Sequence, residues 1–129
     1  MNNTTHISFY LRLNTLYVFS KDLQAMGKPA FIRLLINPDT KQMVLQPYNK
    51  LHFCSFRVPK DIYLPQHSKE TMMRICSQPL CKMLARQFQW DEEASYRIPG
   101  TIYKKQRIVL FDLEKADAIP PAAKQKLVK

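Results

Sequence analysis

Glycine is scarce in this chain, with two residues in 129, and cysteine occurs three times. A phosphate-binding loop needs several glycines for backbone amides to approach the phosphates, so the sequence excludes nucleotide-binding loops of that type. An odd number of cysteines argues against a disulfide framework, and we expect Cys54, Cys76 and Cys81 to be reduced core residues. Their spacing, taken with His52, does not match the paired ligands of a zinc site. We therefore expect no metal and no cofactor.

Long apolar runs and catalytic motifs are also missing. No apolar run approaches the roughly 20 residues that cross a bilayer, and Met1–Tyr10 lacks the basic and apolar regions of a signal peptide. We expect a cytoplasmic protein that makes no membrane contact. The histidines His6, His52 and His67 have no acid or nucleophile at a recognisable spacing, and the acidic run 91–93 is typical of a solvated loop. We expect no enzyme activity.

Positive charge is abundant. The chain has 20 Lys and Arg against 10 Asp and Glu, a formal charge of +10 with histidine neutral. Residues 1–63 and 65–129 each carry +5, so the excess is not confined to a tail. A basic surface attracts polyanions, and nucleic acid is the commonest polyanion in cytoplasm. The charge therefore favours a nucleic-acid partner, with solubility alone as the simpler alternative.

Two stretches of the chain repeat one pattern at a constant offset of 57 residues. In Leu16–Met26 and Met73–Met83, a short apolar run ends in a serine, and leucine and methionine follow three and six residues later. This pattern predicts a strand, a helix capped by Ser20 or Ser77, and the buried face of that helix. We therefore predict that the chain contains two copies of one strand-helix-hairpin unit.

The predicted elements follow from apolar alternation, turn residues and helix signals. In the first unit they are strands Ile7–Leu13 and Leu16–Phe19, a helix from Ser20 to Gly27, and a hairpin of Ala30–Ile36 and Met43–Gln46. In the second they are a longer helix from Ser77 to Trp90, with a core face of Leu80, Met83, Leu84 and Phe88, and strands Ser95–Ile98 and Arg107–Leu113 on either side of Pro99–Gln106.

These elements predict an α+β fold, mainly β, in which the two units form one pseudo-two-fold barrel. The predicted domain spans residues 1–113, with pseudo-repeats at about 7–47 and 68–113 joined by an extended, proline-containing connector. Residues 114–129 contain four lysines and two adjacent prolines without apolar periodicity. This composition predicts a flexible basic tail.

One family resemblance rests on these motifs. Leu16–Gly27, followed by Phe31–Ile36, a turn and Met43–Pro47, resembles the swapped-hairpin unit of the AbrB/SpoVT family. Two such units in one chain are similar to the tandem arrangement of the MraZ family. The resemblance implies a swapped-hairpin barrel and a role in DNA binding. The chain departs from the family pattern at Thr15-Leu16 and Lys28-Pro29, where the family usually has Gly-Arg and Gly-Asp.

The function expected is that of a small bacterial or mobile-element transcriptional regulator that binds duplex DNA through basic residues of strands and hairpins. The candidate contact residues are Arg12, Arg33, Arg74, Arg97, Lys104, Lys105 and Arg107. We also expect that the chain can form a homodimer.

Two alternatives stay open. One is a non-enzymatic protein-interaction or assembly module that pairs with a partner or a second copy through Phe53–Val58 or Ile62–Leu64. The other is a binder of RNA or single-stranded DNA that stacks bases on tyrosines beside basic residues. The tyrosines concerned are Tyr10, Tyr48, Tyr63, Tyr96 and Tyr103.

Overall fold

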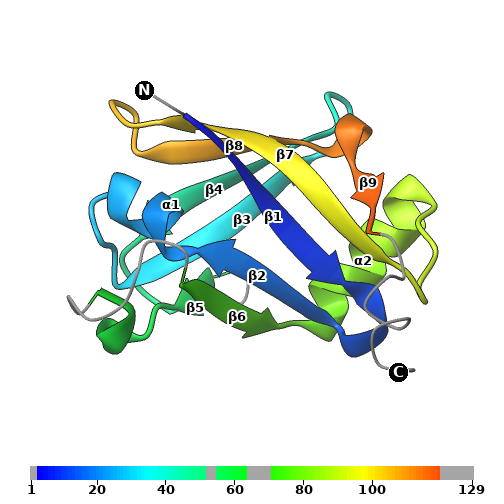
Figure 1. Ribbon diagram of the computed structural model, residues 1–129, viewed down its shortest axis with the longest axis horizontal. Helices are drawn as coiled ribbons and strands as arrows, with labels where there is room; N and C mark the ends of the chain where they lie inside the picture. Colours follow the sequence, from blue (N-terminus) through cyan, green and yellow to red (C-terminus); the bar gives the residue numbers. More distant parts are fainter. Residues whose placement is uncertain (1–2, 52–54, 64–70, 120–129) are drawn as a thin grey trace, which may run out of the picture.

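The computed structural model describes residues 3–51, 55–63 and 71–119. Eight antiparallel strands form a nearly closed barrel in the order β5-β3-β4-β8-β7-β1-β2-β6, and a short ninth strand pairs with β7 (Figure 1). The strands are β1 (Thr4–Tyr10), β2 (Thr15–Phe19), β3 (Phe31–Asn37), β4 (Gln42–Tyr48), β5 (Ser55–Arg57), β6 (Met72–Cys76), β7 (Ser95–Tyr103), β8 (Ile108–Asp112) and β9 (Asp117–Ala118). The helices are α1 (Ser20–Ala25) and α2 (Gln78–Phe88), with 3₁₀ turns η1 (Leu11–Leu13), η2 (Lys60–Tyr63) and η3 (Leu113–Lys115). The expectation of a mainly β fold is confirmed.

The order of elements repeats along the chain. A strand, a 3₁₀ turn, a strand, an α-helix and two further strands occur first as β1-η1-β2-α1-β3-β4 and again as β5-η2-β6-α2-β7-β8. The second unit therefore begins at β5, earlier than the predicted start at residue 68. This strand lies in the extended run Phe53–Val58, which the sequence pattern assigned to the connector between the units, because three strand residues are too few to show which unit they belong to.

The pairing of β2 with β6 is symmetric with respect to the repeat. Tyr17 lies opposite Arg74, which is its own counterpart at the offset of 57 residues. The two ends of this ladder are closed by equivalent hydrogen bonds: the amide of Ser20 donates to the carbonyl of Thr71 (2.7 Å), and that of Ser77 donates to Asn14 (2.9 Å). An antiparallel pair in which a residue faces its own counterpart lies on an approximate twofold axis.

The pairing of β4 with β8 gives the same relation on another part of the barrel. The two hairpins close with the pairs Asn37–Gln42 and Tyr103–Ile108, so equivalent hairpin residues are 66 positions apart. At this offset Val44 corresponds to Leu110, and these two residues lie opposite each other. The registers of both ladders therefore relate the two units by approximate twofold symmetry.

Strands of the two units alternate in pairs around the barrel. The β3-β4 pair of the first unit is followed by β8-β7 of the second and by β1-β2 of the first, while β5 and β6 of the second unit take the two ends. In the parts of the chain that the structure describes, β5 and β6 are not paired with each other, so the barrel stays open between them. Neither unit forms its own sheet.

The barrel interior holds the largest buried side chains, including Phe9 and Phe111, both without solvent exposure. Gly100 on β7 makes this packing possible, because a Cβ at that position would lie 2.5 Å from Cδ1 of Phe111. The scarce glycines therefore occupy positions with a specific requirement. The other one, Gly27, follows α1 with a φ of +92°, which L residues rarely adopt.

Two predicted strand boundaries are wrong. The predicted strand Ile7–Leu13 ends at Tyr10, because the chain turns through η1 and Asn14, whose φ of 51° belongs to the left-handed region that asparagine tolerates. In contrast, β7 continues through the predicted interruption at Pro99. This proline falls between the residues paired with β9 and those paired with β8, where a strand residue need not donate a hydrogen bond on that side.

The two predicted helix caps have different outcomes. The hydroxyl of Ser77 accepts a hydrogen bond from the amide of Leu80 (3.3 Å), which confirms the cap of α2. Ser20 is instead the first residue of α1, where Phe19 holds the cap position without a side-chain bond. The predicted core face of α2 is correct at Leu84 and wrong at Met83, which is 37% exposed. The remaining two members of that face, Leu80 and Phe88, are partly buried against the core.

The predicted tail and cysteines also need correction. Asp117–Ala118, expected in a flexible tail, forms β9 and pairs with Tyr96 and Arg97 of β7; residues 120–129 lie outside the described residues. Cys81 is buried, as expected, and burial raises the pKa of its thiol to about 11. Cys76 is exposed, and Cys54 lies outside the described residues. None of the described helices is long and apolar enough to cross a membrane.

Candidate nucleic-acid interface

Charged residues are distributed unequally over the two ends of the barrel. One end, called the basic end here, consists of α1 with its following loop, η2 and the β7–β8 turn, on the left of Figure 1. Its charged residues are Lys21, Lys28, Lys60, Lys104, Lys105 and Arg107, the buried Asp22, and Asp61. The opposite end contains η1, α2, the loop before β7, the β3–β4 turn, the end of β8, η3 and β9. It holds the acids Asp39, Asp91, Glu92, Glu93, Asp112, Glu114 and Asp117 beside Arg12, Lys41, Lys82, Arg86 and Lys115; we call it the acidic end.

The basic end is held together by contacts between elements that are distant in sequence. The guanidinium of Arg107 lies against Gly27, since a Cβ at Gly27 would be 3.4 Å from Nη1. The hydroxyl of Tyr63 donates to the carbonyl of Pro29 (2.9 Å) and ties η2 to the loop after α1. Lys28 in that loop is exposed. The β7–β8 turn and the loop after α1 therefore present one continuous surface.

Two further predicted contact residues share one row on the outer face of the sheet. Arg97 lies opposite Ser8, Ser8 opposite Tyr17, and Tyr17 opposite Arg74 across β7, β1, β2 and β6. Both arginines are exposed. On its other side Arg97 lies opposite Asp117 of β9, so an acid adjoins this end of the row.

His6 and Lys21 extend this row toward the basic end. His6 packs edge-on against Phe19, with 4.8 Å between ring centroids, and the amine of Lys21 lies 5.8 Å from the same ring. Burial lowers the pKa of His6, and the positive charges of Arg97 and Lys21 lower it further. The imidazole is therefore neutral at pH 7, and the positive charge here belongs to the arginine and the lysine.

The remaining two predicted residues are not part of these groups. Arg33 donates through Nε to Oε1 of Gln46 (2.6 Å) and stacks on Tyr48, with Cζ 4.5 Å from the ring centroid. Arg12 lies in η1, which contacts α2. The structure therefore places Arg74 and Arg97 at the two ends of one row across β6, β2, β1 and β7, and brings Lys104, Lys105 and Arg107 together in one turn. Sequence reasoning missed Lys21 and Lys28, because isolated lysines give no pattern.

The tyrosines proposed as a stacking surface are largely engaged with the protein itself. Tyr96 stacks on Trp90 at 4.7 Å between centroids, and its hydroxyl accepts a bond from the amide of Asp91. Tyr63 and Tyr48 have the partners described above, and Tyr10 packs edge-on against Tyr17. Tyr103 is 41% exposed. These contacts disfavour base stacking on this set of rings.

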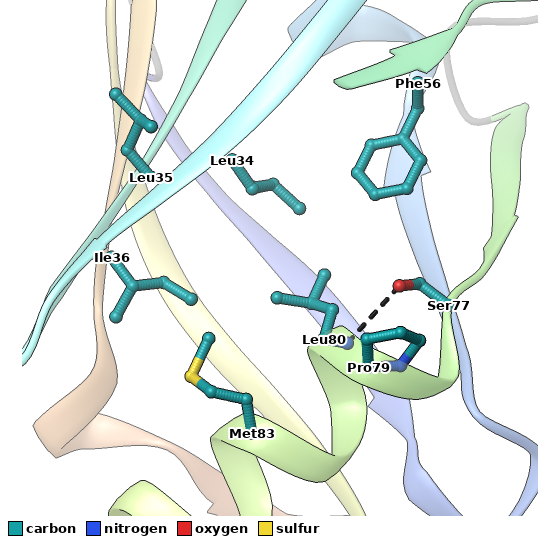
Figure 2. Close-up of a pocket in the computed structure, with 8 residues that line it drawn as sticks. All are labelled: Leu34, Leu35, Ile36, Phe56, Ser77, Pro79, Leu80 and Met83. Atoms are coloured by element: carbon teal, nitrogen blue, oxygen red, sulfur yellow. Dashed lines mark hydrogen bonds between the residues drawn. The ribbon is translucent and has the colours of Figure 1, made fainter. Parts of the chain in front are cut away.

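An apolar cavity of about 400 Å³ lies between β3, β5 and α2, away from the basic end (Figure 2). Leu34, Ile36, Leu80 and Met83 point toward one another across it, and Ser77 is its polar member. None of the described residues that line it is charged. The assembly segments proposed from sequence fall partly outside the described residues, and their members Val58 and Ile62 are buried in the core. The apolar cavity is thus separate from the cationic surface.

No group of three or more metal-ligating side chains occurs in residues 3–51, 55–63 and 71–119. The comparisons with known proteins found no matching family model, no similar curated protein and no similar solved structure. A functional assignment therefore depends on the residues of this chain alone.

Proposed function

We propose that the protein binds duplex DNA as a small transcriptional regulator, and that the basic end provides its main contacts. The observation that carries this proposal is the location of the ion pairs. Within the described part of the chain there are two, Lys41–Glu114 (3.6 Å) and Lys82–Glu92 (2.7 Å), and both lie at the acidic end. The cations of the basic end form no ion pair with a carboxylate of the described residues, so they can contact phosphate.

The shape of this end supports duplex DNA. The β7–β8 hairpin projects its turn residues Lys104 and Lys105 into solvent, and a two-stranded ribbon fits the major groove. Each lysine that contacts a phosphate releases condensed counterions, so the affinity falls with salt concentration. Arg74 and Arg97 would add contacts along the neighbouring sheet face.

We also propose that the barrel is a tandem version of the swapped-hairpin fold of the AbrB and MraZ families. Three features support this assignment: the element order that occurs twice, the alternation of strand pairs from the two units, and the symmetric registers of β2–β6 and β4–β8. A bacterial regulator of transcription would act in the cytoplasm, where the DNA is.

Fluorescence anisotropy with a labelled random-sequence duplex, single-stranded DNA and RNA tests the proposal. Between about 50 and 200 mM salt, we expect duplex affinity to fall steeply, with a log-log slope that counts the phosphate contacts. Absence of binding at the lower salt concentration, or a flat slope, would contradict DNA binding. A stable dimer by light scattering together with no nucleic-acid binding would favour the assembly module instead.

A further inference from the structure

The two hairpin turns are equivalent in backbone and different in charge. Each is a four-residue turn whose last residue has positive φ: Lys41 (56°) in the β3–β4 turn and Arg107 (58°) in the β7–β8 turn. At the offset of 66 residues, Lys105 corresponds to Asp39 and Lys104 to Pro38. The twofold relation of the fold is therefore broken by charge at the positions that project farthest from the sheet.

The surroundings of the two turns increase this difference. Arg107 lies against Gly27, so the next residue, Lys28, adds a further cation beside the β7–β8 turn. Its counterpart Lys41 instead pairs with Glu114 at 3.6 Å. The chain after α1 continues with Lys28, whereas the chain after α2 continues with the acidic run 91–93. The β7–β8 turn therefore lies beside further cations, whereas the β3–β4 turn contains Asp39 and lies beside Asp112 and Glu114.

We infer that the protein docks on duplex DNA with a single polarity, with the β7–β8 turn and Lys28 against the phosphates and the β3–β4 turn directed away. This inference rests on the proposed function and adds to it. Phosphate attracts the first turn and is repelled by the carboxylates beside the second. One chain therefore offers one DNA-contacting end, and its target does not need the twofold symmetry of a palindrome.

A pair of charge-matched double variants tests the polarity. Lys104→Ala with Lys105→Ala removes two positive charges from the basic end, and Lys82→Ala with Arg86→Ala removes two from α2. For the first variant we expect duplex affinity to fall roughly tenfold or more near 100 mM salt, and the log-log salt slope to decrease by about two. For the second we expect a change within about twofold. Thermal melting shows whether both variants remain folded.

The outcomes separate this inference from the proposed function. If the unmodified protein binds no duplex, the proposed function fails and the polarity with it. If it binds and the two double variants weaken binding equally, only the polarity is overturned, because net charge then explains the affinity. If the first variant loses affinity for single-stranded DNA or RNA but keeps its affinity for duplex, the duplex assignment of this end is overturned.

Discussion

Thr5 donates a hydrogen bond of 3.0 Å to Oδ2 of Asp22, while Oδ1 of the same carboxylate is buried without a hydrogen-bond donor among the described residues. Asp22 belongs to the first turn of α1 and has no solvent exposure. Burial raises the pKa of Asp22 to about 6, although the Thr5 hydrogen bond and the charge of Lys21 act in the opposite direction. Ionisation of this carboxyl group therefore opposes folding.

The first prediction concerns the pH dependence of stability. Between about pH 4 and pH 6 the folded protein keeps the Asp22 proton and the unfolded chain loses it, so the free energy of unfolding falls as pH rises through this window. A difference of about two pKa units corresponds to about 3 kcal/mol. Asp22→Asn should remove this fall and make the protein more stable than the unmodified form above pH 6, as measured by urea unfolding at several pH values.

Comparing the unmodified protein with Asp22→Asn isolates the contribution of Asp22 to the pH dependence of stability. His6, whose pKa is lowered, has the opposite effect near its own titration range, because the unfolded chain then binds more protons than the folded one. Both proteins share that contribution, so it cancels in the difference. An equal fall of stability between pH 4 and pH 6 in Asp22→Asn would show that another group causes it.

The second prediction concerns the close contact at Gly100. Gly100→Ala places a methyl group 2.5 Å from Cδ1 and 2.8 Å from Cε1 of Phe111, a buried ring that cannot move without opening the core. We expect a loss of about 1–3 kcal/mol in the free energy of unfolding, measured by urea denaturation. In a protein that already carries Phe111→Leu, Gly100→Ala should lower the free energy of unfolding by less than it does in the unmodified protein. An unchanged stability of Gly100→Ala would refute this account of the packing.

The third prediction separates the two serines of the repeat. Ser77→Ala removes the acceptor for the amide of Leu80 and should cost about 1 kcal/mol, whereas Ser77→Asp should retain the cap. At Ser20, the first helical residue of α1, Ser20→Asp should give no capping benefit and should instead lower stability, because that side chain is fully buried. Chemical denaturation of the three variants measures these differences. Equal responses to aspartate at both positions would contradict the different placement of the two serines.

The fourth prediction distinguishes a structural arginine from contact arginines. Arg33→Ala removes the bond to Gln46 and the stacking on Tyr48, so we expect stability to fall by about 1 kcal/mol with DNA affinity unchanged. Arg74→Ala, on the exposed row, should show the reverse: unchanged stability and a reduced salt slope. Anisotropy and thermal melting on the same samples check both. A larger loss of DNA affinity in Arg33→Ala than in Arg74→Ala would contradict these roles.

Much of the fold follows from local patterns. The apolar run before each helix gives the correct strands β2 and β6, and the turn after Ile36 gives the β3–β4 hairpin, because these patterns depend on neighbouring residues. The errors occur where tertiary contacts decide. The segment of β5, expected in the connector, belongs to the barrel through its pairing with β3, and β7 passes Pro99 because its neighbours change there. No window of sequence contains these partners.

The sequence indicates which types of residue form the candidate site, but it does not show how they are arranged in space. A basic chain with arginines in apolar strands indicates cations on the outer face, and Arg74 and Arg97 do lie there. The contrast between the two ends depends on Arg107 lying beside Gly27 and on Glu114 lying beside Lys41, pairs that are 80 and 73 positions apart. The two halves of the sequence carry the same net charge, and folding places most of the acids at one end of the barrel.

The alternation of strands from the two units also affects biosynthesis. When the first unit leaves the ribosome, β1, β2 and β4 still lack the neighbours β7, β6 and β8, which are translated later. Their unsatisfied edges remain open to other chains until the last hairpin emerges, so folding is completed late and depends on long-range closure. A nascent chain that stalls before residue 108 would be prone to aggregation.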